Sequence, residues 1–166
     1  MSVRKLARIA IFAAVLFVVQ VTLSFIPNCE LVSLLLICMT LIYGKEMIIT
    51  SLVFAGLETM VYGIGTWTLM YLYVWPVLVL AVLLLKPIVK SNFTVWAVVA
   101  GIYGLSFGFL CTLIYIPLGW NYCLAYFIKG LQFDVIHGAS NFIITLTLGK
   151  TVYTALNRVS KISKKD

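Results

Sequence analysis

Long apolar runs separated by short polar breaks follow one another along the whole chain. We expect six helices from these runs, at residues 6–26, 30–43, 47–64, 68–85, 93–116 and 133–157. A helix of about 20 apolar residues, rising ~1.5 Å per residue, spans a hydrocarbon core ~30 Å thick. The pattern therefore predicts an all-α integral membrane protein, with residues 1–166 forming one compact bundle of six transmembrane helices.

The first two runs differ in length and in their flanks. Residues 6–26 follow a basic start, as in a signal peptide, but the apolar run is longer than a signal peptide needs. Ile26-Pro27-Asn28 follows it instead of a small-residue cleavage site, so we expect a retained first helix. Residues 30–43 are short for a span, which predicts a helix that is only partly exposed to lipid.

Composition and charge support a membrane location and an orientation. Charged residues make up only 10% of the chain and hydrophobic ones 63%, whereas a soluble domain carries about 25% charged residues. The net charge of +7 would suit nucleic acid, but the cations stand at the ends of the runs. With both termini in the cytoplasm, only Lys129 lies outside. The inside then carries Arg4, Lys5, Arg8, Lys45, Lys86, Lys90, Lys150, Arg158, Lys161, Lys164 and Lys165, as the positive-inside rule requires.

A stripe of small residues marks the fifth run. Ala97, Gly101, Gly104 and Gly108 stand at offsets of four, seven and eleven, which keeps them on one helix face. Small side chains let a neighbouring helix approach closely, so we expect tight packing there. Residues 117–132, which are mixed and aromatic, are expected to form a loop or an interfacial helix.

Glu58 is a carboxylate within an apolar run. An ionisable group at the membrane centre costs roughly 2.5–3.5 kcal/mol on insertion scales, so it usually has a use. Tyr62 lies one turn further on the same face. Glu58 is either an acceptor or counter-charge for a ligand, or a carboxylate paired inside the bundle with Lys129 or His137.

The last run carries a second polar group. Asp134, His137, Asn141 and Thr145 stand at offsets of 0, 3, 7 and 11, and they therefore share one helix face. Such a stripe cannot face lipid and must face protein or a cavity. It either contributes to a binding site or links helices through polar contacts.

Aromatic residues gather on the predicted outer side. They are Trp67, Tyr71, Tyr73, Trp75, Trp120, Tyr122 and Tyr126. Trp and Tyr anchor membrane proteins at the interface, but apolar walls with a few polar groups also describe a ligand pocket, and flat rings suit a ring compound. The candidate substrate-binding residues are Glu58, Tyr62, Trp67, Tyr71, Trp75, Asp134, His137 and Asn141.

Motifs for catalysis or metal binding are absent from the sequence. It contains no glycine-rich phosphate loop, no HExxH and no GxSxG, so we expect neither an enzyme nor a cofactor. Four cysteines, Cys29, Cys38, Cys111 and Cys123, show no metal-ligand spacing with His137 and are interpreted as apolar packing thiols. A Cys29–Cys123 bridge is conceivable, because both lie on the predicted outer side. Any ATP-driven transport would need its ATPase from another chain.

Several of these stretches together carry a resemblance to a known family. They are the basic start followed by AIFAA at 10–14, which matches an AxxxA pattern, and the segments PNCELVSLL at 27–35, YLYVW at 71–75 and FDVIH at 133–137. Over essentially its whole length the chain resembles the substrate-binding (S) components of bacterial energy-coupling factor (ECF) transporters.

The resemblance implies a multi-pass protein of the bacterial plasma membrane that binds a vitamin or related micronutrient from outside with high affinity. It also implies partners, namely a transmembrane scaffold (T) subunit and two cytoplasmic ATPase subunits, and a binding subunit that topples in the membrane to deliver its substrate. The face formed by Ala7, Ala10 and Ala14 would dock on the scaffold, although only Ala10 and Ala14 match the motif. The substrate-binding residues are inferred from the sequence pattern, not from the family.

Three other interpretations stay open at this point. A small self-sufficient proton-coupled transporter or channel would use Glu58 and His137 as a proton-linked pair. An assembly protein would use the polar stripe only to hold helices together. A membrane-bound enzyme comes last, because the sequence offers no nucleophile–base or metal constellation.

Overall fold

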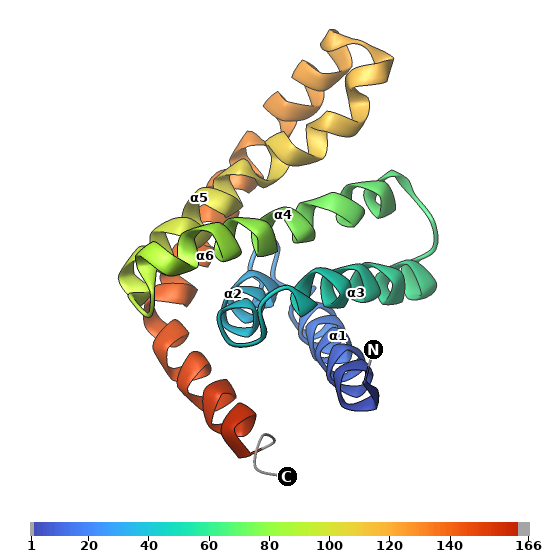
Figure 1. Ribbon diagram of the computed structural model, residues 1–166. Helices are drawn as coiled ribbons and strands as arrows, with labels where there is room; N and C mark the ends of the chain where they lie inside the picture. The colour runs from blue at the N-terminus through green and yellow to red at the C-terminus, as the bar shows by residue number, and fades with distance from the viewer. Residues whose placement is uncertain (1, 163–166) are drawn as a thin grey trace.

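The computed structural model describes residues 2–162, and the chain within that range is helical apart from short connections. The elements in order (Figure 1) are α1 (Val3–Leu23), α2 (Val32–Tyr43), α3 (Glu46–Tyr62), α4 (Thr66–Val89), α5 (Phe93–Thr112), the 3₁₀ helix η1 (Leu113–Leu118) and α6 (Trp120–Ile162). The predicted all-helical fold with six α-helices is confirmed for the described residues. The first five helices begin close to their expected starts.

Three helical segments are long and apolar enough to cross a membrane by length and composition. They are Val3–Leu23, Thr66–Val89 and Phe93–Leu118, the last of which joins α5 and η1. α2 is a shorter apolar helix. These three segments are compatible with a membrane protein.

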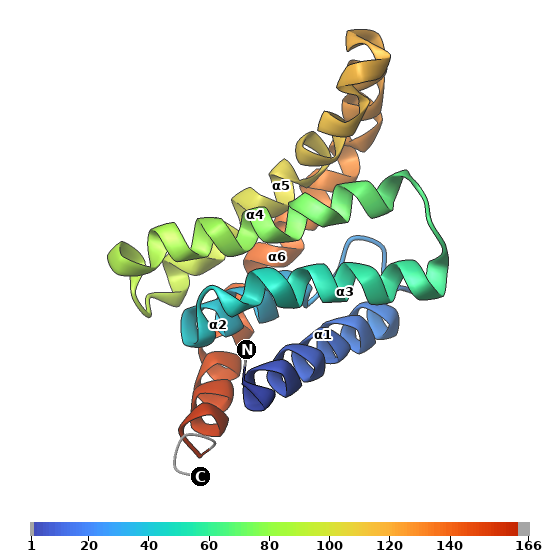
Figure 2. The same cartoon turned by 45° about the vertical axis from the view of Figure 1, so that its right-hand side comes forward.

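α6 differs most from the prediction. The loop or separate interfacial helix expected at 117–132 is wrong, because α6 begins at Trp120 and continues unbroken for 43 residues. Residues 120–132 contain no proline, and their rings pack against the end of α5 and η1, as Tyr126 does on Tyr115 at 4.7 Å between ring centres. Gly119, at φ 107°, makes the turn that precedes α6. The result is a helical arm that projects from the remaining helices (Figures 1 and 2).

α2 occupies the centre of the molecule. Nine of its 12 residues are buried, and it contacts α1, α3, α4, α5 and α6. A helix that is apolar on all sides is stable only where other helices cover it, and α2 is covered in this way. The expectation that this short helix is shielded is confirmed. Gly44 ends it in a conformation with φ 66°, which the turn into α3 requires.

α5 and α6 form the most extensive helix pair, and glycines lie at their contact. A Cβ added to Gly104 would lie 2.8 Å from the Cα and N atoms of Gly138 on α6. A Cβ on Gly101 would lie 3.2 Å from Cβ of Phe142. The predicted small-residue stripe therefore does allow a neighbouring backbone to approach closely, and that backbone belongs to α6.

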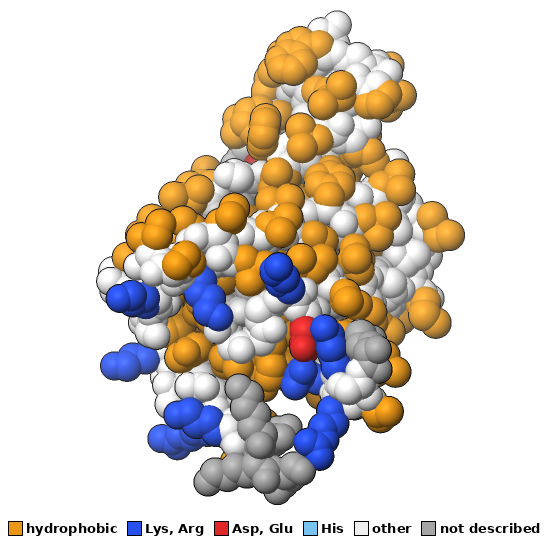
Figure 3. Space-filling model, viewed as in Figure 1, with side chains coloured by type: hydrophobic (Ala, Val, Ile, Leu, Met, Phe, Trp, Pro, Cys, Tyr) orange, Lys and Arg blue, Asp and Glu red, His pale blue; other side chains and the backbone are white. Residues whose placement is uncertain are grey.

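Cationic side chains gather on the face of the molecule where the two chain termini lie (Figures 1 and 3). On that side Arg8 of α1 donates to Glu46 Oε2 of α3 from Nε at 2.9 Å and from Nη2 at 2.7 Å. The Arg8 guanidinium also lies 4.9 Å from the ring centre of Tyr43. These contacts tie α1 to the α2–α3 turn. Lys164 and Lys165, which belong to the same predicted group of cations, lie outside the described residues.

Gly104→Ala should lower the free energy of unfolding by about 1–3 kcal/mol, because the new methyl group meets backbone atoms that cannot rotate away. Gly56→Ala is the matched control, since a Cβ at this exposed position in α3 meets nothing within 4 Å. Alanine has a higher helix propensity than glycine, so Gly56→Ala should not lower the free energy of unfolding. Thermal unfolding in detergent, followed by circular dichroism, measures both. Equal melting temperatures for Gly104→Ala and wild type would contradict the packing described for α5 and α6.

Candidate functional site

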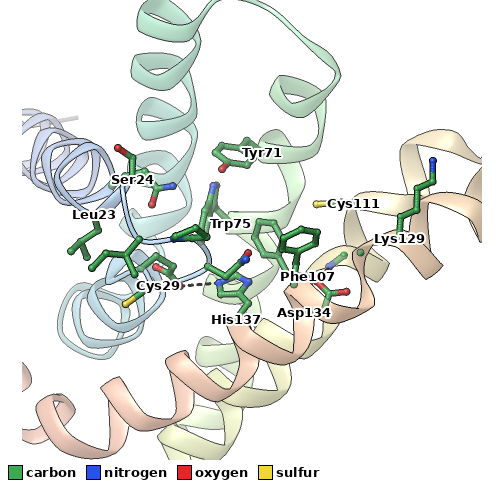
Figure 4. A pocket seen from close by; sticks show the side chains of 18 of the residues that line it. Leu23, Ser24, Cys29, Tyr71, Trp75, Phe107, Cys111, Lys129, Asp134 and His137 are labelled. Carbon is green, nitrogen blue, oxygen red and sulfur yellow. Dashed lines mark hydrogen bonds and ion pairs between the residues drawn. The ribbon is translucent and has the colours of Figure 1, made fainter.

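A cavity of about 580 Å³ lies between the α1–α2 connection and helices α4, α5 and α6 (Figure 4). This volume is within the range of about 300–1,000 Å³ that is typical of small-molecule sites. Its lining comprises Gln20, Leu23, Ser24, Ile26, Pro27, Asn28, Cys29, Glu30, Tyr71, Trp75, Phe107, Gly108, Cys111, Tyr126, Lys129, Gly130, Phe133, Asp134 and His137. Four predicted site residues are therefore brought together here: Tyr71, Trp75, Asp134 and His137.

A row of rings from three helices forms one wall of the cavity. Tyr71 meets Trp75 edge-on at 5.5 Å between ring centres, Trp75 lies 5.7 Å from Phe107, and Phe107 lies 4.9 Å from His137. Trp75 is only 1% exposed, so its position is determined by its neighbours. Edge-to-face and tilted contacts of this kind hold flat walls in place. Sequence reasoning did not identify Phe107.

His137 pairs with Glu30, a residue that sequence reasoning also missed. His137 Nε2 lies 3.3 Å from Glu30 Oε1, and the Ser33 backbone N–H donates to Glu30 Oε2 at 2.8 Å. The alternative in which Glu58 pairs with Lys129 or His137 is wrong for the described residues.

Asp134 is held by α5. Its Oδ1 accepts a hydrogen bond from the Gly108 backbone N–H at 2.9 Å, whereas Oδ2 is buried and has no hydrogen-bond partner in residues 2–162. A side chain at position 108 would overlap the carboxylate, so glycine is needed there for this close approach. Trp75 Nε1 and Gln20 Oε1, from other residues of the lining, are also buried and have no hydrogen-bond partner among the described residues.

The polar stripe of α6 is divided between the cavity and the helix packing. Asp134, His137, Asn141 and Thr145 are all buried, which confirms that the stripe faces protein. Asp134 and His137 line the cavity. Asn141, by contrast, donates from Nδ2 to Ser33 Oγ on α2 at 3.3 Å and is not part of the lining. Two members of the stripe thus line the cavity and Asn141 links α6 to α2, and a ligand-binding role for the lining residues stays a prediction.

Glu58, Tyr62 and Trp67 line a separate, smaller hollow of about 240 Å³, together with Tyr71. Glu58 is 5% exposed, and its Oε1 has no hydrogen-bond partner among the described residues. Tyr71 lines both hollows, with Trp67 meeting it edge-on at 5.4 Å. The structure therefore distributes seven of the eight predicted binding residues over two hollows that share Tyr71, and Asn141 lines neither.

The docking alanines of α1 and three of the aromatic residues line neither hollow. Ala7, Ala10 and Ala14 are exposed on the outer face of α1, whose inner face buries Ile9, Ala13 and Leu16. Trp120 and Tyr122 are exposed on the arm, and Tyr73 donates to the Leu110 carbonyl at 2.8 Å. All four cysteines are free thiols, so Cys29 and Cys123 form no bridge.

Comparison with known proteins finds no matching family model, no matching curated protein and no matching solved structure. Across residues 2–162, no group of three or more His, Cys, Asp or Glu side chains is placed to hold a metal ion. The cavity therefore has aromatic walls, the Glu30–His137 ion pair, the half-paired carboxylate of Asp134 and the exposed Lys129.

Glu30→Ala should lower the free energy of unfolding by about 3 kcal/mol, because it leaves the buried imidazole of His137 without its partner. A double-mutant cycle with His137→Ala should give a coupling of about 1–2 kcal/mol. Denaturant unfolding of the two single variants and of the double variant measures this coupling. Additive single-mutant effects would show that the pair contributes nothing.

Proposed function

We propose that this protein is the substrate-binding subunit of an ECF-type importer, which captures a vitamin or related micronutrient at the outer side of a bacterial plasma membrane. The observation that supports this most is the cavity of about 580 Å³, in which four sequence-predicted residues converge with Glu30 and Phe107. Apolar walls with a few placed polar groups describe a site that binds and orients a small molecule.

The orientation that we propose has six membrane spans with both termini in the cytoplasm. Arg4, Lys5 and Arg8 lie at the start of α1, whereas Ser24 and Glu30 of the cavity follow its other end. A cytoplasmic basic face would then leave the cavity in the outer half of the membrane, where an imported micronutrient arrives.

In this proposal, partner subunits drive the delivery of the bound substrate into the cell. The exposed Ala7, Ala10 and Ala14 face of α1 is available to a transmembrane scaffold subunit, because small side chains allow close helix approach. The scaffold would couple to two cytoplasmic ATPase subunits. A proton-coupled transporter built on a Glu58–His137 pair has less support, since these two side chains line different hollows.

Native mass spectrometry of the protein, purified in mild detergent from cells grown on rich medium, is the direct test. We expect one small-molecule adduct per chain, bound without ATP, because a high-affinity binder retains its ligand through purification. The adduct mass also identifies the substrate. A ligand-free spectrum that persists after incubation with a vitamin mixture would contradict the proposal. Flux in proteoliposomes without other subunits would favour the self-sufficient transporter instead.

Trp75→Ala should weaken the adduct at least about tenfold, because it removes the central ring of the cavity wall. Trp96→Ala is the matched control. Trp96 is also fully buried, but it lies outside the cavity and donates to the Lys90 carbonyl at 2.9 Å. Gel filtration checks that both variants stay monodisperse, and Phe107→Leu, which keeps apolar volume but loses the ring, replaces Trp75→Ala if that variant unfolds. Equal retention of the adduct in the cavity variants and in Trp96→Ala would exclude the cavity as the site.

A further inference from the structure

Asp134 is a buried carboxylate of the cavity that is only half paired. The side chain is 6% exposed, one oxygen accepts a single backbone hydrogen bond, and the other has no partner in the described chain. No ion pair within residues 2–162 involves this carboxylate. A buried carboxylate is costly unless a cation or several donors compensate it. The single backbone donor leaves the second oxygen of Asp134 without a hydrogen bond among the described residues.

The other charged groups of the cavity do not provide that compensation. His137 is engaged with Glu30, and both oxygens of Glu30 already have donors. Lys129 extends away from Asp134 in Figure 4 and is exposed on the arm. Glu30 thus pairs with His137, whereas Asp134 forms no ion pair among the described residues and lies beside an aromatic wall.

The local structure maintains Asp134 in this state. Gly108 leaves room for the carboxylate against the α5 backbone and holds Oδ1 through its N–H. This arrangement orients the carboxylate at the edge of the cavity, with only one of its oxygens hydrogen-bonded within residues 2–162. The neighbouring rings of Trp75 and Phe107 attract cations through their faces, Trp most strongly.

We propose that the cavity selects a flat, nitrogen-containing cation, such as a protonated amino-substituted heterocycle or an amidine, whose N–H group pairs with Asp134. The inference rests on the proposed function of this cavity as the binding site, and it narrows the substrate to a cationic ring. A charge-assisted N–H···O⁻ bond is roughly twice as strong as a neutral one, which gives the selectivity its physical basis. Anionic micronutrients are disfavoured, because a second negative charge would lie beside Asp134.

Three isosteric probes test the selectivity. Benzamidinium, benzamide and benzoate have nearly the same size and shape but carry a positive, zero and negative charge. Their binding to the detergent-purified protein is measured by titration calorimetry, with empty micelles as the blank. Benzamidinium should bind at least about tenfold more tightly than benzamide, which corresponds to about 1.4 kcal/mol, and benzoate should bind most weakly.

Two carboxylate-to-amide variants show whether Asp134 is responsible. Asp134→Asn keeps an oxygen for the Gly108 N–H but replaces the free acceptor by a donor, so the preference for benzamidinium should disappear. Glu46→Gln makes the same charge change at the basic end of the molecule, where Glu46 binds Arg8, and should leave the preference intact.

The inference is overturned if benzoate binds as tightly as benzamidinium, if the preference survives in Asp134→Asn, or if none of the probes binds. These outcomes are separate from a failure of the proposed function, which native mass spectrometry tests. A neutral or anionic adduct whose binding is independent of Asp134 would leave the binding function in place and remove only the cationic selectivity.

Discussion

The close contact of α5 with α6 at their glycines is the constraint on which the candidate site depends. With Gly104 against the Gly138 backbone, the two helices lie close enough for Asp134 to reach the Gly108 N–H. The same approach places His137 beside Phe107, at 4.9 Å between ring centres. Larger residues along this line would separate the helices and move both polar groups away from the α4 wall. Backbone proximity, more than any single side chain, therefore determines the geometry of the cavity.

The central position of α2 supplies the second half of the site. A short apolar helix surrounded by five others brings its N-terminal segment, with Glu30 and Ser33, into the interior. The polar groups that enter with it meet the α6 stripe, where Glu30 pairs with His137 and Ser33 accepts from Asn141. Buried polar groups are tolerated when they satisfy one another, and this network links residues more than 100 positions apart in sequence. The Glu30–His137 pair, which lines the cavity, thus also connects the segment before α2 to α6.

Periodicity and residue size predicted much of this structure, because both act locally. The helix positions, the small-residue face of α5 and the inward-facing stripe of α6 follow from spacing alone. Contacts between residues that are far apart in the sequence cannot be predicted from spacing in this way. Glu30 stands at the start of a run, where a charge usually marks a helix boundary, and nothing in its neighbourhood indicates His137. Glu58 and Trp75 are near in sequence, but the Gly63–Gly65 turn puts Glu58 on α3 and in another hollow. The start of α6 was missed because its aromatic residues resemble an interfacial loop, and only the facing end of α5 and η1 makes them a helix.

In the proposed membrane orientation, the length of α6 limits how this helix can lie in the bilayer. At ~1.5 Å per residue its 43 residues extend about 65 Å, roughly twice the thickness of a hydrocarbon core. In the proposed orientation the helix must tilt or continue through the headgroups, and Trp120 and Tyr122 suit that polar–apolar boundary. A change in bilayer thickness alters the balance between tilt and protrusion. Because α6 also carries Asp134 and His137, the depth of the cavity entrance, and with it access for a ligand, becomes a property of the surrounding membrane as well as of the protein.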